Sequence, residues 1–304
     1  MTMSPTSAIV GVDWGTTHRR TYVIRPTGEC IRESSDGDGA LACKGRFPEA
    51  LTGALTSVQA TPSLVVASGM VGSALGWHEV PYVDASVPLQ DLGRHVFRVP
   101  DAPGDAPEVL VPGYCIRNSA GVPDVMRGEE TQLLGAWALG HVSGWFVLPG
   151  THSKWVLLQD GVVRKLRTYM TGELYDLLRK HGTLAAAASG QATWDDAAFA
   201  AGVDAAGHHA LSHVLFGTRA RVVSKDMAPQ ASASYLSGLL IGAELKDVLG
   251  AEAGEVPTFQ LIGSPQLAEL YQKAAQRLDC RFDILDARQA FLAAVQHIHS
   301  HWSA

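Results

Sequence analysis

The 304-residue chain has few cysteines and no excess of basic residues. Its four cysteines, at positions 30, 43, 115 and 280, lie far apart and form no Cys-x-x-Cys pair. This pattern argues against a disulfide framework or a cysteine-based zinc site and favours a reducing compartment. The 24 Lys and Arg residues are outnumbered by 30 Asp and Glu, giving a formal charge of −6. Nucleic-acid-binding proteins normally carry a basic surplus, so we expect no nucleic-acid partner.

The sequence also lacks a long apolar run. Its longest stretch without formal charge, residues 131–153, is interrupted by several glycines, His141 and Pro149. It therefore does not match a membrane span of about 20 apolar residues. Residues 1–7 are polar and unlike a secretory signal. These features predict a soluble, cytoplasmic protein with no membrane partner.

The length predicts two domains, since about 150 residues is a common size for one compact domain. Apolar residues make up 46% of the chain, enough to give each domain a core. Residues 64–67 and 259–262 have the pattern of buried strands, whereas residues 129–139, 234–249 and 286–299 have helical spacing. This alternation of strands and helices predicts an α/β fold.

Two segments, one near the start and one near the middle, share a pattern. Apolar runs at residues 9–12 and 145–148 pass into turns of small residues, Gly15-Thr16-Thr17 and Gly150-Thr151-His152-Ser153. Each turn is followed by a second β-rich run, at residues 20–25 and 154–159. Because a strand, a tight hairpin and a strand occur twice, we expect two domains with similar first hairpins. We divide the chain into residues 1–138 and 139–304.

Asp13 ends the first apolar run, directly before the Gly15-Thr16-Thr17 turn. A carboxylate there can hold hydrated Mg²⁺, while glycine lets backbone N–H groups approach phosphate oxygens. A hairpin with a capping aspartate explains the same residues. The second hairpin adds Lys154, and two such hairpins facing one another across a cleft could bind the phosphates of a triphosphate. The chain has neither a GxxxxGK[ST] nor a GxGxxG loop, which argues against those two nucleotide folds.

A third group, Arg127-Gly128-Glu129-Glu130, stands at the start of a predicted helix. Adjacent acids at a helix start are commonly favourable partners of the helix dipole. Alternatively, one carboxylate acts as the general base for a substrate hydroxyl, and Arg127 binds an anion.

Several blocks resemble known proteins. GVDWGTTHRR and LPGTHSKW look like the two phosphate motifs of the superfamily of sugar kinases, actin and heat-shock ATPases. DWGTT, GMVGS followed by GW, MRGEETQL, PGTHSKWV, MTGEL and YLSGLLIGAE together resemble the 2-dehydro-3-deoxygalactonokinase family, from about residue 9 to residue 299. The resemblance implies two actin-like (ribonuclease H-like) domains with a cleft between them. It also implies ATP- and Mg²⁺-dependent phosphorylation of 2-dehydro-3-deoxy-D-galactonate at its 6-hydroxyl, in galactonate degradation.

The resemblance assigns roles to individual residues. Asp13 would position Mg²⁺, and Glu129 matches the position of the catalytic base, although Glu130 beside it could serve instead. LIGSPQLAELY is similar to a degenerate adenosine motif, although a plain turn explains its Gly263 and Ser264 equally. The residues expected to bind ATP are Gly15, Thr16, Thr17, Arg20, Gly150, Thr151, His152, Lys154, Gly263 and Ser264.

The sugar acid is expected to contact segments near these motifs. Arg127 could hold its carboxylate by a bidentate pair. Trp77 could stack on an apolar face of the sugar, although core packing explains Trp77 and Tyr82 equally. The expected substrate residues are Gly69, Met70, Val71, Gly72, Ser73, Trp77, Tyr82, Arg127, Thr171 and Glu173.

Two other functions stay open. The same fold could phosphorylate another keto-deoxy sugar acid, such as the gluconate-derived epimer. A non-catalytic sensor that binds ATP and a sugar acid would be expected to lack the acids that Asp13 and Glu129 supply. The oligomeric state is not readable from these residues, and a homodimer is compatible with them.

Overall fold

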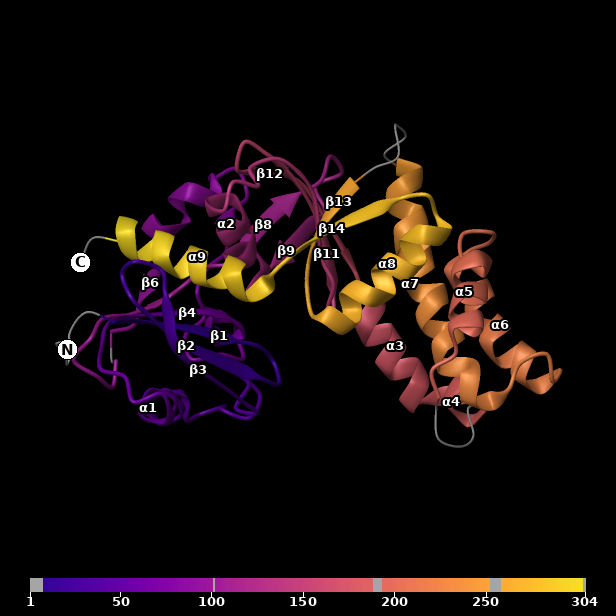
Figure 1. The fold of residues 1–304 in the computed structure, drawn as a ribbon, viewed down its shortest axis with the longest axis horizontal. Coiled ribbons are helices and arrows are strands. Elements are labelled where there is room, and N and C mark those ends of the chain that lie inside the picture. Colours follow the sequence, from indigo (N-terminus) through magenta and orange to yellow (C-terminus); the bar gives the residue numbers. More distant parts are fainter. Residues whose placement is uncertain (1–7, 101, 188–192, 252–257, 303–304) are drawn as a thin grey trace. The chain divides into compact units, whose positions relative to one another are not determined.

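The computed structural model describes residues 8–100, 102–187, 193–251 and 258–302. The chain divides into two compact units. Unit 1 comprises Met1–Gly144, Val156–Arg167 and Asp286–Ala304, and unit 2 comprises Trp145–Trp155 and Thr168–Leu285. Strands and helices alternate along the chain (Figure 1), which confirms the α/β class.

Unit 1 is built on a six-stranded sheet of order β3-β2-β1-β4-β7-β6. Its first hairpin joins β1 (Ala8–Trp14) to β2 (Arg19–Ile24), as the sequence predicts, and β4 (Pro62–Gly69) lies parallel to β1 on the other side. The remaining strands are β3 (Cys30–Asp36), β6 (Phe97–Arg98) and β7 (Glu108–Leu110).

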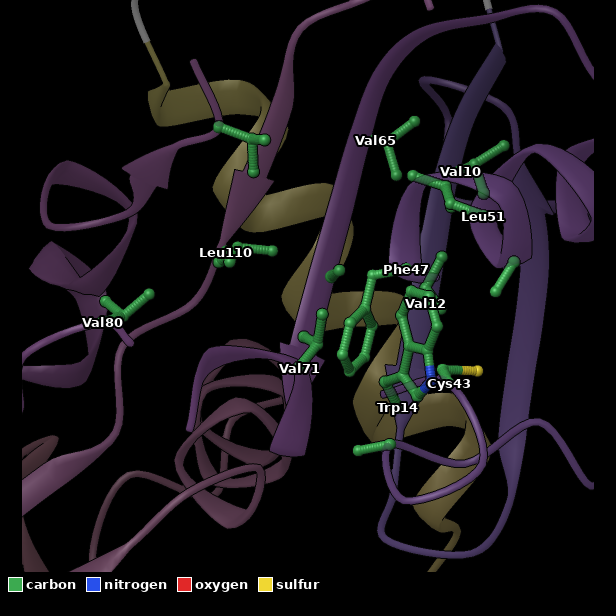
Figure 2. Close-up of a cluster of buried hydrophobic side chains, with 14 of the residues drawn as sticks. Val10, Val12, Trp14, Cys43, Phe47, Leu51, Val65, Val71, Val80 and Leu110 are labelled. Carbon is green, nitrogen blue, oxygen red and sulfur yellow. The ribbon is translucent and has the colours of Figure 1, made fainter. Parts of the chain in front are cut away.

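Strand β1 is covered on both faces. Val10, Val12 and Trp14 point to one side and pack with Phe47 and Leu51 of α1 (Phe47–Ser57), as Figure 2 shows. On the other side Gly11 lies against α9 (Ala287–His301), where an added Cβ would be 2.9 Å from the Phe291 and Val295 side chains. Burial on both faces holds the end of β1, and therefore Asp13, in a fixed position.

The helices α2 (Glu129–Ala138) and α9 pack closely within unit 1. A Cβ at Gly135 would lie 1.6 Å from the Ala290 carbonyl oxygen, so only glycine permits this approach. The final helix therefore packs in unit 1, although the division predicted from the sequence places it in the domain of residues 139–304. The segment Val156–Arg167 also belongs to unit 1, although the predicted division places it in that same second domain.

The other elements of unit 1 are short. A three-stranded sheet contains β5 (Val83–Asp84), β8 (Tyr114–Arg117) and β9 (Pro123–Met126), in that order. Unit 1 also contains the short 3₁₀ helices η1 (Met70–Gly72) and η2 (Leu89–Arg94).

A second sheet has the strand order β12-β11-β10-β13-β14. The predicted second hairpin joins β10 (Gly144–Leu148) to β11 (Ser153–Gln159), and β12 (Val162–Tyr169) follows. Strands β13 (Thr258–Ile262) and β14 (Arg281–Leu285) are parallel to each other and connected by α8 (Pro265–Arg277), as crossover geometry requires.

Among its described residues, unit 2 has five helices between β12 and β13. They are α3 (Thr171–Lys180), α4 (Gly182–Ala187), α5 (Asp196–Ala205), α6 (Leu211–Val223) and α7 (Ser232–Ala251), with η3 (Pro229–Ala231) before the last. Helices α5 and α7 approach closely, since a Cβ at Gly238 would be 2.0 Å from the Phe199 carbonyl oxygen. Within the described ranges, no helix combines the length and apolar character needed to cross a membrane.

Candidate active site

The turn of the first hairpin presents free backbone N–H groups. The Gly15 amide donates to the His18 carbonyl at 2.9 Å, and Thr16, Thr17 and His18 are exposed. In the described part of the chain, no hydrogen bond uses the amides of Thr16 and Thr17. Successive unpaired amides of this kind form a concave site for an anion such as phosphate.

Asp13 and Arg20 are cross-strand partners on β1 and β2 beside this turn. Arg20 Nη1 lies 3.1 Å from Asp13 Oδ2, and the Asp13 side chain retains 21% of its exposure. Burial raises the pKa of Asp13, while the charge of Arg20 opposes that rise. Ser68, the partner of Asp13 on β4, has a buried hydroxyl that lacks a hydrogen-bond partner among the described residues.

These groups fit a magnesium ion. Mg²⁺ in nucleotide sites is held by one or two protein carboxylates together with phosphate oxygens and water. Asp13 supplies one partly exposed carboxylate at the strand end, beside the free amides of the turn. In the described ranges no three His, Cys, Asp or Glu side chains gather into a metal-binding group, and such a site does not require one.

The two acids at the start of α2 have different environments. Glu130 is completely buried, and both of its carboxyl oxygens accept the Gly128 amide, at 2.9 and 2.8 Å. Burial, followed by the charge of Glu129, raises the pKa of Glu130 to about 8. Glu129 is only partly buried, and its carboxylate accepts the Arg127 amide at 3.0 Å. Of the two, Glu129 is the carboxylate that a substrate could reach.

Arg127, Tyr82 and Gly72, three of the residues predicted to contact the sugar acid, lie together in unit 1. The Arg127 guanidinium carbon is 4.3 Å from the centre of the Tyr82 ring, and Nη2 donates to the Val80 carbonyl at 2.6 Å. The Nε and Nη1 atoms are buried and have no partner in the described chain. A Cβ at Gly72 would be 2.9 Å from Nη1, so the absence of a side chain at Gly72 leaves space beside the Arg127 guanidinium. Buried N–H groups without acceptors are costly, which favours an anionic ligand here.

Other expected substrate residues in unit 1 are buried or half-buried. Gly69, with φ of 91°, lies against the Trp14 carbonyl and directly precedes η1, and the Ser73 hydroxyl, at the other end of η1, donates to the Met70 carbonyl at 2.8 Å. Val71 is 1% exposed and belongs to the core of unit 1, so only its backbone is available. Met70 and Trp77 pack partly buried against the same core, and the Trp77 ring contacts His78.

In unit 2, the second hairpin is contacted by the first turn of α3. Thr151 and His152 are exposed at its tip, and Gly150 is partly buried. His152 Nε2 lies 2.5 Å from the Glu173 carboxylate, and the Glu173 amide donates to the Thr151 carbonyl at 2.9 Å. Lys154 is 7% exposed, and its ammonium donates to the Thr168 hydroxyl at 3.0 Å instead of standing at the tip.

Glu244 of α7 is a buried acid that the sequence analysis does not single out. Its carboxylate accepts the Trp155 indole N–H at 2.6 Å, the Tyr271 hydroxyl at 2.9 Å and the Thr171 hydroxyl. Burial raises its pKa, and these donors oppose the rise. Through these hydrogen bonds, Glu244 links β11, the second strand of the second hairpin, to the first turn of α3. An acid inside an apolar helix is the one sequence signal that could have pointed to it.

Gly263 and Ser264 form the turn between β13 and α8. The Ser264 hydroxyl accepts the Leu267 amide at 3.3 Å and caps α8, which is the ordinary role of serine before a helix. A Cβ at Gly263 would be 3.2 Å from the Pro149 ring. Both residues therefore have a local structural role, and adenosine binding by them stays a prediction.

Comparison with known proteins gives a consistent result. A model of the family described as 2-keto-3-deoxy-galactonokinase matches residues 13–298. A Rhizobium meliloti (strain 1021) protein named as a probable 2-dehydro-3-deoxygalactonokinase is 35% identical over 303 residues, covering 96% of this chain and 97% of that protein. The 2-dehydro-3-deoxygalactonokinase of Escherichia coli (strain K12) is 33% identical over 297 residues, covering 96% and 98%.

A solved structure of a protein from the same family is also similar to this chain. The crystal structure of a candidate 2-dehydro-3-deoxygalactonokinase from Sinorhizobium meliloti superposes with a TM-score of 0.88 at 32% identity, covering 97% of this chain and 100% of that one.

Proposed function

Because the chain belongs to the 2-keto-3-deoxy-galactonokinase family, we propose that it transfers the γ-phosphate of ATP to the 6-hydroxyl of 2-dehydro-3-deoxy-D-galactonate. The observation that carries the proposal is the arrangement at the start of α2 and in the two residues before it. There a carboxylate that a substrate can reach, Glu129, accepts the amide of Arg127, whose own guanidinium has two buried N–H groups without acceptors. A base and an anion-binding group on one turn are what a sugar-acid kinase needs.

Each hairpin, within its own unit, has groups that suit the phosphates of ATP. The exposed turns at Thr16-Thr17 and Thr151-His152 offer backbone amides to phosphate oxygens, and the exposed Arg20 adds a positive charge. Asp13 would hold Mg²⁺ together with the phosphates. When bound, the ion neutralises charge on the phosphates.

The acceptor hydroxyl is activated by Glu129. Its carboxylate takes the proton of the 6-hydroxyl as that oxygen forms a bond to the γ-phosphorus, and the bond from phosphorus to the leaving ADP oxygen breaks. Glu130 is a poor candidate, because a carboxyl whose pKa is raised to about 8 already carries its proton at neutral pH. Its burial supports a role in building the turn.

The sugar carboxylate is bound by Arg127. The Tyr82 ring stacks on the guanidinium and restrains it, so less freedom is lost when the ligand binds. This arrangement supports a preference for sugar acids over neutral sugars.

An assay of ADP release tests the function. Purified protein with ATP, Mg²⁺ and 2-dehydro-3-deoxy-D-galactonate should release ADP only when the sugar acid is present. ATP hydrolysis at the same rate without the sugar acid, or no ADP release with it, would contradict the proposal.

A further inference from the structure

In unit 1, the segment after β3 donates hydrogen bonds to the carbonyl groups of the first hairpin turn. The Ala40 amide donates to the Gly15 carbonyl at 2.9 Å, and the Leu41 amide to the Thr16 carbonyl at 3.2 Å. Gly39 lies directly on the turn, where a Cβ would be 2.5 Å from the Thr16 carbonyl oxygen and 2.4 Å from the Thr17 carbonyl carbon. Any larger residue at position 39 must displace the turn.

That segment is itself firmly held. Arg19, which is 3% exposed, binds Asp36 at 2.8 Å and approaches Asp38 within 3.5 Å. The Trp14 indole N–H donates to the Asp38 carbonyl at 2.8 Å. Residues 36–41 therefore form a fixed support against which the turn is positioned.

In unit 2, the first turn of α3 contacts the second hairpin in a comparable way. The Glu173 amide donates to the Thr151 carbonyl at 2.9 Å. A Cβ at Gly172 would be 2.3 Å from the Gly150 carbonyl oxygen, so this position also requires glycine. The hydrogen bond from Thr171 to the buried Glu244 anchors the support.

The direction of each carbonyl determines the direction of the next N–H. In a trans peptide the C=O of one residue and the N–H of the following residue point in opposite directions. Holding the Gly15 and Thr16 carbonyls against the support therefore turns the Thr16 and Thr17 amides to the opposite side. Holding the Thr151 carbonyl does the same for the His152 amide. In the described residues, neither the Thr16 amide nor the Thr17 amide donates a hydrogen bond.

We propose that Gly39 and Gly172 are positioning residues for the triphosphate: each lets a supporting segment hold the hairpin carbonyls, so that the hairpin amides face the phosphates before ATP arrives. Neither residue needs to touch the nucleotide. This inference rests on the proposed function, since it assumes that the hairpins bind phosphates.

Calorimetry with ATP and with adenosine, each with Mg²⁺, tests the proposal. Gly39→Ala and Gly172→Ala should each weaken ATP binding about tenfold or more, as expected from losing a hydrogen bond to a charged group. Adenosine binding should not change, because adenosine has no phosphates. Two controls are matched: Gly37→Ala lies in the same loop as Gly39, and Gly250→Ala is helical like Gly172. Both positions have open space around an added Cβ, and both variants should bind ATP as the wild type does.

The possible results distinguish failure of the positioning role from failure of the proposed kinase function. Unchanged ATP affinity in both test variants would overturn the positioning role, and so would an equal loss for ATP and adenosine. A wild-type protein that binds no ATP would overturn the proposed function as well.

If a variant fails to fold, amide hydrogen exchange measured by NMR on the nucleotide-free wild type still tests the inference. The Ala40, Leu41 and Glu173 amides should be protected while those of Thr16, Thr17 and His152 exchange freely. The reverse pattern would contradict the inference.

Discussion

The Gly128 backbone N–H donates to both oxygens of the buried Glu130 carboxyl group, at 2.9 and 2.8 Å. Gly128 has φ of 107°, which favours glycine, and it lies against Gly69, with an added Cβ only 3.3 Å from the Gly69 Cα. The Glu130 contact therefore stabilises the turn that carries Arg127 and Glu129. Glu130 supports the site from within the core.

The raised pKa of Glu130 predicts a pH dependence of stability. In the folded state this carboxyl keeps its proton up to about pH 8, whereas its ordinary pKa is 4.5. The unfolded chain therefore binds fewer protons between these values, and the Glu130 contribution to stability falls as the pH rises. Relative to the wild type, Glu130→Gln should gain stability from pH 5 to pH 8. Urea unfolding of both proteins measures the difference, and a difference that does not vary with pH would contradict the assignment.

Replacement of the proposed base should affect chemistry and spare ATP binding. Glu129→Gln should lower kcat by about 100-fold or more, the usual contribution of a general base, with ATP affinity close to that of the wild type. Glu130→Gln is the matched comparison and should retain most of the turnover, since its amide oxygen can still accept the Gly128 N–H. Steady-state kinetics decide the matter: an active Glu129→Gln beside an inactive Glu130→Gln would move the base to Glu130.

Arg127 should determine affinity for the sugar acid. Arg127→Met removes the charge and should raise KM for the sugar acid by about 10- to 100-fold, as expected for hydrogen bonds to a charged group, with little effect on KM for ATP. Arg127→Lys keeps the charge without the planar pair of donors and should fall between these limits. Arg117→Met, on the β8–β9 hairpin, serves as the control. An equal rise in both KM values would show that Arg127 has a general structural role.

The contact between α2 and α9 should be sensitive to a single methyl group. Gly135→Ala places a Cβ 1.6 Å from the Ala290 carbonyl oxygen, so the helices must move apart, at a cost of about 1–3 kcal/mol. Gly53→Ala in α1 meets open space and should leave the protein as stable as the wild type or slightly more so. Thermal unfolding of the two variants provides the comparison, and equal Tm values would contradict the packing described here.

Local patterns predicted much of this fold. The hairpin at Asp13, the strand predicted at residues 64–67 and the helix that begins at Glu129 follow from apolar periodicity and from glycine-rich turns, which are local signals. The observed strand β4 extends two residues further, through Ser68 and Gly69, where a turn was predicted. Strand β3 was not predicted, because its sequence CIRESSD is polar and its pairing with β2 is a tertiary contact.

The motifs of the candidate site could be found from the sequence. The directions in which their side chains point could not be predicted as well. Lys154 directly follows the turn of the second hairpin and has a charge that suits phosphate binding, yet in the fold its ammonium is directed to Thr168. Val71 lies in a glycine-rich segment, yet its side chain is in the core. The bond from Thr171 to Glu244 joins residues 73 positions apart, and no local pattern indicates such a pair. These features depend on which side chains the finished fold brings together.

The central claim is that the chain phosphorylates the 6-hydroxyl of 2-dehydro-3-deoxy-D-galactonate. The most direct test is NMR of the product formed from ATP and this sugar acid. The account predicts one new phosphomonoester signal in the ³¹P spectrum, coupled to the protons on carbon 6, and an equal amount of ADP. Inorganic phosphate as the only new phosphorus species, or a phosphate ester at another carbon, would contradict it.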